Sequence, residues 1–152
     1  MVDIAGGERL EAAMSPDALK QVLLNLVQNG REAYEGWTSR SAEPARIAIN
    51  VAQVEGEVRI EVKDNGPGIP PEILSRIFDP FFTTKDAVHG VGLGLFVAEG
   101  LVRTAGGRIT AGQISDADST GGNGGRGAWF RIELPVAAAV SGSSTHHAQV
   151  SA

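Results

Sequence analysis

The sequence predicts an α+β domain, a two-layer α/β sandwich in which helices cover one face of a mixed, mostly antiparallel sheet. Residues 15–37 place apolar side chains at helical spacing over a long stretch. Residues 47–51 and 58–62 alternate apolar and polar side chains on either side of Gly56, which is typical of an antiparallel hairpin with a buried face. Residues 128–135 alternate in the same way and predict a further strand.

The first predicted helix begins with Ser15, a good N-cap residue, and Pro16, which suits the first helical position. Its buried stripe is predicted to contain Leu19, Val22, Leu23, Leu26, Val27, Gly30, Ala33, Tyr34 and Trp37. A second helix is predicted from Gly92 to about Gly106, with Leu95, Ala98, Leu101, Val102 and Ala105 on its apolar side.

The remaining segments connect or flank these elements. We expect a short edge strand at 8–14, a short helix starting at Pro70–Pro71, a long loop at 79–90, a strand at 106–114, a polar loop at 115–127 and a disordered tail at 137–152.

Composition excludes several classes of protein. The chain has 152 residues, enough for one domain with its own core, and no cysteine, which excludes disulfides and thiol catalysis. Its net charge of −5 gives no basic surface, so no nucleic-acid partner is expected. No apolar run approaches the roughly 20 residues of a membrane span, and no secretory leader is visible. We therefore expect a cytoplasmic location, with a membrane involved only through other parts of a parent protein.

Glycines alternate at the start of the second predicted helix, at Gly90, Gly92 and Gly94. The segment lacks the preceding strand of a dinucleotide fingerprint and the Gly-Lys-Ser/Thr of a P-loop. Two interpretations stay open for these glycines. They form either a flexible hinge or a phosphate site, which the free N–H groups and the dipole of a helix start favour.

Three polar residues, Asn25, Asn29 and Glu32, form a second line along the first helix at i, i+4 and i+7. Side-chain oxygens of this kind are ligands that suit Mg²⁺ when it shares phosphate oxygens with a nucleotide. A solvated polar face is the alternative, and it is the more economical one for an isolated asparagine pair.

Asp64 shares its strand parity with Ile60 and Val62 and so points toward the core side, where a carboxylate needs a partner. The amino group of a purine is one such partner, and Gly66 and Gly68 allow the chain to turn closely around a flat base. The alternative is an Asx-turn, because Asp-Asn-Gly-Pro-Gly is good turn chemistry by itself.

The segment "IFDPFFTTK" gathers Phe78, Phe81 and Phe82 in one loop. They either anchor the loop by burial or form a hydrophobic flap. Lys85 is placed to meet a phosphate, although an ordinary surface lysine would look the same.

Four segments, "NLVQNG", "DNGPGI", "IFDPFFTTK" and "GVGLGL", occur in this order. In this arrangement they closely resemble the N, G1, F and G2 boxes of the ATP-binding catalytic domain of two-component sensor histidine kinases. That domain has the Bergerat fold and belongs to the superfamily of gyrase, Hsp90 and MutL. The resemblance covers about residues 8–135, and "FFTTK" and "NGREA" look most like the nitrogen-regulatory and oxygen-sensing class. It implies a catalytic domain over 1–136 with an ATP lid at about 79–91.

The resemblance assigns roles residue by residue. Asn29 would be a Mg²⁺ ligand together with Asn25, Asp64 would accept the adenine amino group, and Asn25 and Lys85 would serve catalysis. ATP contacts are implied for Asn25, Asn29, Asp64, Gly66, Gly68, Ile69, Phe81, Thr83, Thr84, Lys85, Gly90, Val91, Gly92, Leu93, Gly94 and Leu95. The segment "GRGAWFRIELP" resembles the last glycine box, with glycines at Gly125 and Gly127.

The sequence departs from the family pattern at three positions. Gly30 replaces the commoner alanine after the metal-binding asparagine, which should weaken the helix slightly. Val91 stands where Ser or Thr is frequent, and Ala105 replaces a common histidine. None of these changes removes a group that the chemistry requires.

The implied function is to bind Mg·ATP and donate its γ-phosphoryl group to a histidine on a separate dimerisation and phosphoacceptor domain, upstream of a response regulator. His89, His146 and His147 do not lie in such a helix, so we predict that the chain binds Mg·ATP without phosphorylating itself. A hydrolase of the gyrase kind is disfavoured, because Asn25 stands where that branch has a glutamate that activates water. The alternatives are a stand-alone serine kinase of the anti-sigma-factor type and a degenerate module that binds partners without nucleotide.

Overall fold

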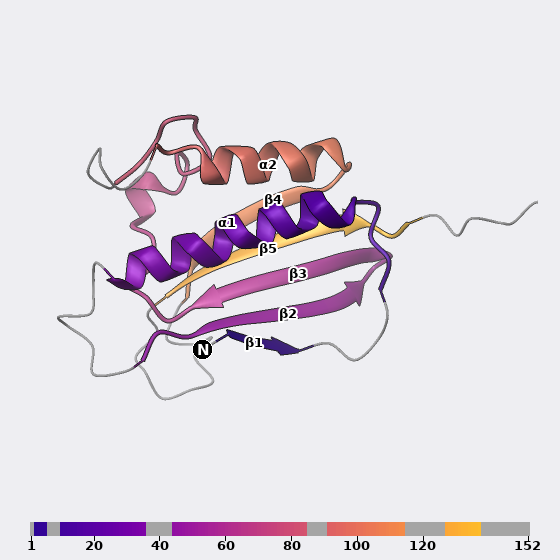
Figure 1. The fold of residues 1–152 in the computed structure, drawn as a ribbon, viewed down its shortest axis with the longest axis horizontal. Helices are drawn as coiled ribbons and strands as arrows, with labels where there is room; N and C mark the ends of the chain where they lie inside the picture. Colours follow the sequence, from indigo (N-terminus) through magenta and orange to yellow (C-terminus); the bar gives the residue numbers. More distant parts are fainter. Residues whose placement is uncertain (1, 6–9, 36–43, 85–90, 115–126, 138–152) are drawn as a thin grey trace, which may run out of the picture.

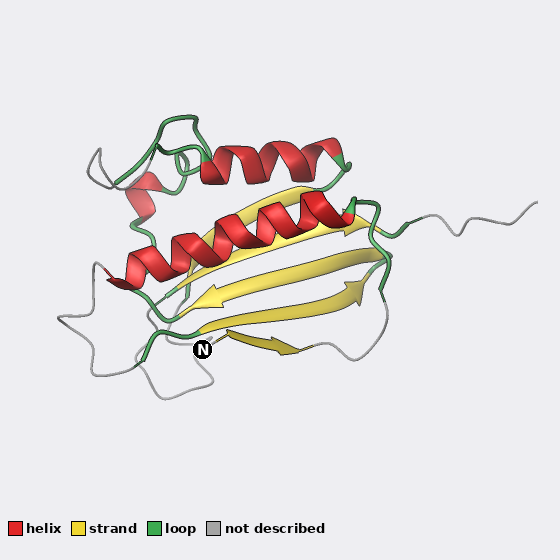
Figure 2. Cartoon of the chain, viewed as in Figure 1, coloured by secondary structure: helices red, strands yellow, loops and turns green. Residues whose placement is uncertain are grey.

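The sheet and helices form two layers in the computed structural model, which describes residues 2–5, 10–35, 44–84, 91–114 and 127–137. The sheet has five strands in the order β1-β2-β3-β5-β4. Helices α1 and α2 lie side by side on the same face of this sheet (Figures 1 and 2). The predicted α+β sandwich is therefore confirmed.

The strands are β1 (Val2–Ala5), β2 (Ile47–Val54), β3 (Glu57–Asp64), β4 (Arg108–Gln113) and β5 (Ala128–Pro135). β1 runs parallel to β2, and every other neighbouring pair is antiparallel. The predicted β2–β3 hairpin closes at Glu55 and Gly56, whose φ angles of 52° and 83° are those of a tight hairpin turn.

The longer helix, α1 (Pro16–Glu35), begins where the sequence predicts, and the Ser15 hydroxyl accepts the N–H of Ala18 at 3.3 Å. Helix α2 (Gly94–Thr104) starts two residues later than predicted, because Gly92 adopts a left-handed φ of 70° that a helix does not accept. The predicted short helix after Pro70 is only the 3₁₀ turn η2 (Pro71–Ile73).

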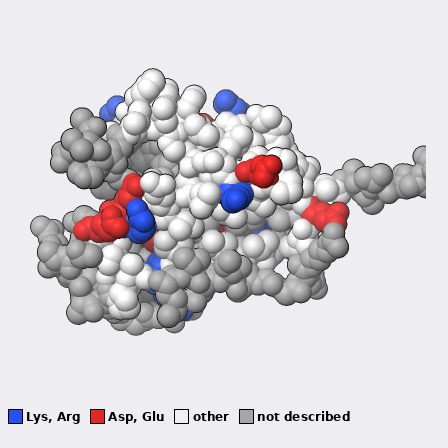
Figure 3. Space-filling view, in the orientation of Figure 1, with Lys and Arg blue, Asp and Glu red and all other residues white. Residues whose placement is uncertain are grey.

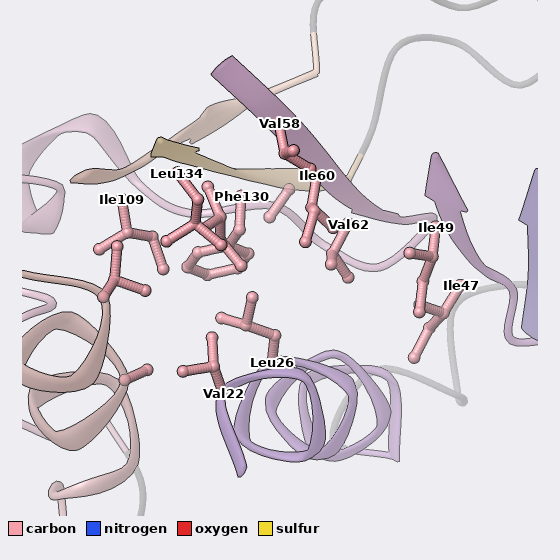
Figure 4. Packing of buried hydrophobic residues seen from close by; sticks show 14 of the residues in the cluster. Val22, Leu26, Ile47, Ile49, Val58, Ile60, Val62, Ile109, Phe130 and Leu134 are labelled. Carbon is pink, nitrogen blue, oxygen red and sulfur yellow. The ribbon is translucent and has the colours of Figure 1, made fainter. Parts of the chain in front are cut away.

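The core lies between α1, α2 and the sheet. Val22 and Leu26 of α1 point at the strand side chains in Figure 4, and at most 1% of either residue is exposed. Facing them are Ile60, Val62, Phe130, Ile132 and Leu134, each no more than 5% exposed. Burial of one such side chain stabilises the fold by roughly 1.5–3 kcal/mol, so this layer fixes α1 firmly on the sheet.

The predicted edge strand at 8–14 is wrong in its position. The first strand of the sheet is β1, and the described part of the later segment, residues 10–14, makes a single antiparallel bridge, between Ala12 and Val136. Alanine has a low preference for strands, and the chain bends at Ala13 and Met14 before α1 begins, so the pairing cannot extend.

The face of the sheet opposite the helices carries a lattice of ion pairs. Alternation predicts Glu133 on the outer side of β5, yet only 5% of it is exposed. Arg59 donates to it from β3 at 2.9 Å and Arg108 from β4. Arg131 pairs with Glu61 at 2.8 Å in the same layer. The lattice joins the three strands and leaves the acidic groups paired.

Several expectations fall outside the described residues. These are the tail at 138–152, most of the loop at 115–127, Trp37, and Lys85, Gly90 and His89 of the predicted lid. Within the described part of the chain, neither α1 nor α2 has the length and apolar character needed to cross a bilayer.

Candidate functional site

A cavity of about 180 Å³ opens between the second half of α1 and the β2–β3 edge of the sheet. It contains the predicted site residues Asp64 and Gly66 and reaches Gly30 on α1. Its walls are formed by Val27, Gly30, Arg31, Tyr34, Ala45, Arg46, Ile47, Asp64, Asn65 and Gly66. Most of these side chains present carbon to the cavity, and Asp64 is the only carboxylate among them.

Asp64, the last residue of β3, lines the cavity with its carboxylate. Its Oδ1 atom accepts the N–H groups of Gly66 at 2.9 Å and Ala128 at 3.2 Å. No described residue donates to Oδ2. Burial raises the pKa of this carboxyl, and the two backbone hydrogen bonds offset that rise only in part. The site thus presents a desolvated acceptor that gains from a hydrogen-bond donor on a ligand.

The glycine-rich turn after Asp64 is packed against the start of β5. Gly127 has a φ of 139°, and a Cβ there would fall 2.0 Å from the Asp64 carbonyl oxygen. A Cβ at Gly68, whose φ is 81°, would come 3.1 Å from the Gly127 carbonyl oxygen. These two glycines let the turn approach β5 closely, and this approach brings the Ala128 N–H to the carboxylate.

Asn65 ties the turn to the segment that leads into β2. Its Oδ1 accepts the N–H of Arg46 at 2.7 Å, and its Nδ2 donates to the carbonyl of Pro44 at 3.0 Å. The Asn65 N–H also donates to the Arg46 carbonyl at 3.2 Å. The Asx-turn interpretation of this segment is therefore confirmed. The turn uses only Oδ1 of Asp64, so it is compatible with the ligand interpretation, which stays a prediction.

The line of polar residues on α1 reaches toward the start of α2. Asn25 Nδ2 donates to the carbonyl of Gly94 at 2.9 Å, and its Oδ1 accepts from Gln21 at 3.0 Å. Asn29 lies one helical turn closer to Asp64, and its amide makes no hydrogen bond within the described part of the chain. Within the described residues, Asn29 is thus the asparagine of this line whose amide oxygen is not already bonded.

The start of α2 is open to an anion. Leu93 occupies the N-cap position, and no side chain of the described residues caps the first turn. The first N–H groups of the helix, at Gly94 and Leu95, therefore have no intrahelical partner and can meet a negative group. Asn25 holds this helix start against α1.

The backbone at Gly92 closes onto the phenylalanine loop. Phe81 N–H donates to the Gly92 carbonyl at 3.0 Å. A Cβ at Gly92 would lie 2.6 Å from both the Phe81 carbonyl carbon and the Phe82 oxygen. Only glycine fits at this crossing, which joins the two ends of the predicted lid.

The three phenylalanines behave differently. Phe78 and Phe82 pack against the core, and the Arg76 guanidinium lies 4.8 Å from the centre of the Phe82 ring. Phe81 does not anchor the loop, since it is 71% exposed and its φ is 64°. Of the two alternatives, anchoring by burial therefore applies to Phe78 and Phe82, and the exposed Phe81 fits the hydrophobic flap.

The other predicted contacts lie around these two regions. Ile69 and Leu95 are partly buried against the core, whereas Thr83, Thr84 and Val91 are exposed. Arg31, Tyr34, Arg46 and Asn65 were not predicted as site residues. Tyr34 follows the helical apolar stripe, and its position one turn after Gly30 is the signal that could have placed it in the cavity wall.

Asp64 in its cavity and the uncapped start of α2 lie at opposite ends of one stretch of α1, from Gly30 back to Asn25. This arrangement suits a ligand with a hydrogen-bond donor at one end and a negative charge at the other. The chain belongs to the family described as histidine kinase-, DNA gyrase B-, and HSP90-like ATPases, which matches residues 14–138.

Relatives within this family are sensor kinases. The two-component sensor PprA of Pseudomonas aeruginosa is 40% identical over 131 residues, which cover 86% of this chain and 13% of that protein. The sensor histidine kinase ZraS of Escherichia coli O157:H7 is 36% identical over 126 residues, which cover 83% of this chain and 24% of ZraS. The chain thus spans only a fraction of the length of these curated relatives.

Solved structures agree with this assignment. The catalytic domain of histidine kinase ThkA is 32% identical with a TM-score of 0.66, covering 89% of this chain and 79% of that one. The mycobacterial sensor histidine kinase MprB, at 22% identity and a TM-score of 0.69 over 89% of this chain and 81% of the other, shares the fold.

Proposed function

We propose that this chain is the ATP-binding catalytic domain of a two-component histidine kinase. In this role it binds Mg·ATP and donates the γ-phosphoryl group to a histidine on a separate phosphoacceptor domain. The observation that carries the proposal is the Asp64 carboxylate, which lines a largely carbon-lined cavity of about 180 Å³ and whose Oδ2 receives no hydrogen bond from the described residues. An adenine ring supplies both an apolar face and an amino donor for this environment.

The two ends of ATP fit the two ends of the site. In the proposed pose the base lies between Gly30 and Asp64, and the phosphates extend along α1 toward the start of α2. Backbone N–H groups and the dipole of α2 then stabilise phosphate charge without reorganisation, which is the main demand of phosphoryl transfer on a protein. The full-length kinase ShkA, 28% identical with a TM-score of 0.61, was solved in complex with AMPPNP, an ATP analogue, which supports a triphosphate ligand here.

Mg²⁺ fits the oxygen donors of α1. No group of three His, Cys, Asp or Glu side chains within the described residues is arranged to hold a metal by itself. Mg²⁺ usually keeps several waters and shares phosphate oxygens, so one amide oxygen from Asn29 suffices as a protein contact. The Asn25 amide is already hydrogen-bonded to Gln21 and to the Gly94 carbonyl, so its proposed role is to position α2. Its oxygen can bind the metal only after the hydrogen bond from Gln21 breaks. When bound, Mg²⁺ would neutralise charge on the transferred group.

The partner surface lies beside the phosphate end. The helix face of the molecule carries few charged side chains (Figure 3). Around the start of α2 it exposes Phe81, Val91, Phe96 and Val97, each at least 40%. Apolar exposure of this kind is typical of a contact surface, so the phosphoacceptor domain is proposed to dock here. The response regulator is then a partner of the parent kinase. Because ATP is supplied in the cytoplasm, the transfer reaction is proposed to take place there.

Transfer to an added acceptor tests this function. The chain is incubated with Mg²⁺ and γ-labelled ATP, alone and with the phosphoacceptor hairpin of a related kinase such as ZraS. We expect no stable label on the chain alone and acid-labile phosphohistidine on the hairpin. Acid-stable phosphoserine on an acceptor would instead indicate the serine-kinase alternative. No binding of ATP at all would indicate a nucleotide-independent module.

A further inference from the structure

Gly30 is a glycine that the backbone does not need. It lies inside α1, is buried, and has no left-handed φ. Glycine in a helix interior is less favourable than alanine. The chain therefore keeps an unfavourable residue at a place where the local conformation would accept a side chain.

The surrounding atoms leave room for a methyl group. A Cβ at Gly30 would lie 3.5 Å from the Asp64 Cβ and 3.6 Å from its Oδ2, which are ordinary contacts. It would lie 3.2 Å from the Cδ1 atom of Ile47, the flexible end of that side chain. Gly92 differs, because a Cβ there would meet rigid backbone at 2.6 Å. Steric exclusion thus explains Gly92 but does not explain Gly30.

The unfilled space belongs to the cavity. Gly30, Ile47 and Asp64 all line it. The Oδ1 atom of Asp64 is already bonded to the N–H groups of Gly66 and Ala128, so Oδ2 is the oxygen left for a ligand. The missing methyl group would stand in van der Waals contact with that same Oδ2. The space therefore lies next to the atom that receives the amino group of the base.

We propose that Gly30 sets the base specificity of this site and admits adenine nucleotides that carry a small alkyl group on the exocyclic amine. This inference rests on the function proposed above. A secondary amine keeps one N–H to donate to Asp64 Oδ2, and its alkyl carbon packs against the bare Cα of Gly30, in the part of the cavity that a Cβ would cover. With alanine at position 30, unsubstituted adenine still fits, whereas the substituted base meets the added methyl group.

Titration calorimetry of the full chain with Mg²⁺ tests the inference, using ATP and N6-methyl-ATP as the two probes. Wild type is expected to bind them within about 3-fold of one another. Gly30→Ala is expected to lower the affinity for N6-methyl-ATP about 10-fold or more beyond any change in its affinity for ATP, the size of effect that one extra carbon causes in a filled pocket.

Gly100→Ala is the matched control, because Gly100 lies in α2, a Cβ there would have no atom within 4 Å, and the residue does not line the cavity. Its ratio of the two affinities should equal that of wild type. The inference is overturned if wild type already rejects N6-methyl-ATP, or if Gly30→Ala leaves the ratio unchanged, while ATP itself binds. If neither protein binds ATP, the proposed function fails as well, so the ATP titration separates the two failures.

Discussion

Replacing Asp64 with asparagine separates the two roles of its carboxylate. The Oδ1 atom accepts N–H groups from Gly66 and Ala128, and an asparagine oxygen can take over both bonds. This orientation places the new NH₂ group where Oδ2 stands. Two donors then face each other when adenine enters, because the amino group of the base also donates.

The magnitude follows from the bond that is lost. A hydrogen bond to a charged group contributes about 1.5–3 kcal/mol, so Asp64→Asn should weaken ATP binding by about 10- to 100-fold. A base with a 6-oxo group offers an acceptor to the new NH₂, so ITP should lose less affinity than ATP or gain some. Calorimetric titrations of both nucleotides against both proteins measure this. Equal loss for ATP and ITP would refute the assigned geometry of the carboxylate.

Stability should change in the opposite direction. Burial raises the pKa of Asp64, so the charged form is a cost to the folded state that appears as the pH rises through the raised pKa. Below the ordinary pKa near 3.8 the side chain is protonated in both states and the cost disappears. Asp64→Asn should therefore melt at a higher temperature than wild type at pH 7, with the difference shrinking toward pH 3. A lower melting temperature for Asp64→Asn at pH 7 would contradict this prediction, because it would mean that hydrogen bonds in the folded protein fully offset the cost of burying the Asp64 charge.

The remaining predictions concern other parts of the structure. Gly92→Ala places a Cβ 2.6 Å from backbone atoms of the phenylalanine loop, so it should lower the free energy of unfolding by about 1–3 kcal/mol and weaken ATP binding. Denaturation and ATP titration measure both effects, with Gly100→Ala as the control. Asn65→Ala removes side-chain bonds of 2.7 and 3.0 Å and should cost about 1 kcal/mol while lowering ATP affinity several-fold; an unchanged affinity would mean that the cavity wall holds without them. The hydrogen bond from Arg108 lowers the pKa of Glu133 despite its burial, so Glu133→Gln should cost about 2 kcal/mol at pH 7 and progressively less as the pH falls below the ordinary value of 4.5. Urea denaturation at several pH values measures that difference, and a constant difference would contradict the pairing.

Periodicity was enough to predict most of the fold. The strands β2, β3 and β5 and the helix α1 each bury one face. One-sided burial is encoded in the local spacing of apolar residues, so it can be predicted without knowing which element covers that face. The edge strand was placed wrongly because short edge segments carry little alternation. The buried state of Glu133 was not predictable either, since it depends on arginines from two strands that only the register brings together.

The site was predictable where local chemistry and spacing coincide. Asp64 follows strand parity, and Asn29 follows helical spacing, so each could be assigned to an inward or polar line. The cavity walls at Arg46 and Tyr34 could not, because they meet only after β2 and α1 pack on β3. The sequence could not decide between burial and exposure for Phe81 for a related reason: its backbone bonds to Gly92 in a left-handed conformation, and its side chain is exposed.

A structure of the chain with AMPPNP and Mg²⁺ tests the central claim most directly. We expect the base between Gly30 and Asp64, its amino group donating to Asp64 Oδ2, and the phosphates against the first N–H groups of α2. A nucleotide bound at any other place, or one that leaves the Asp64 carboxylate without a contact, would contradict this assignment.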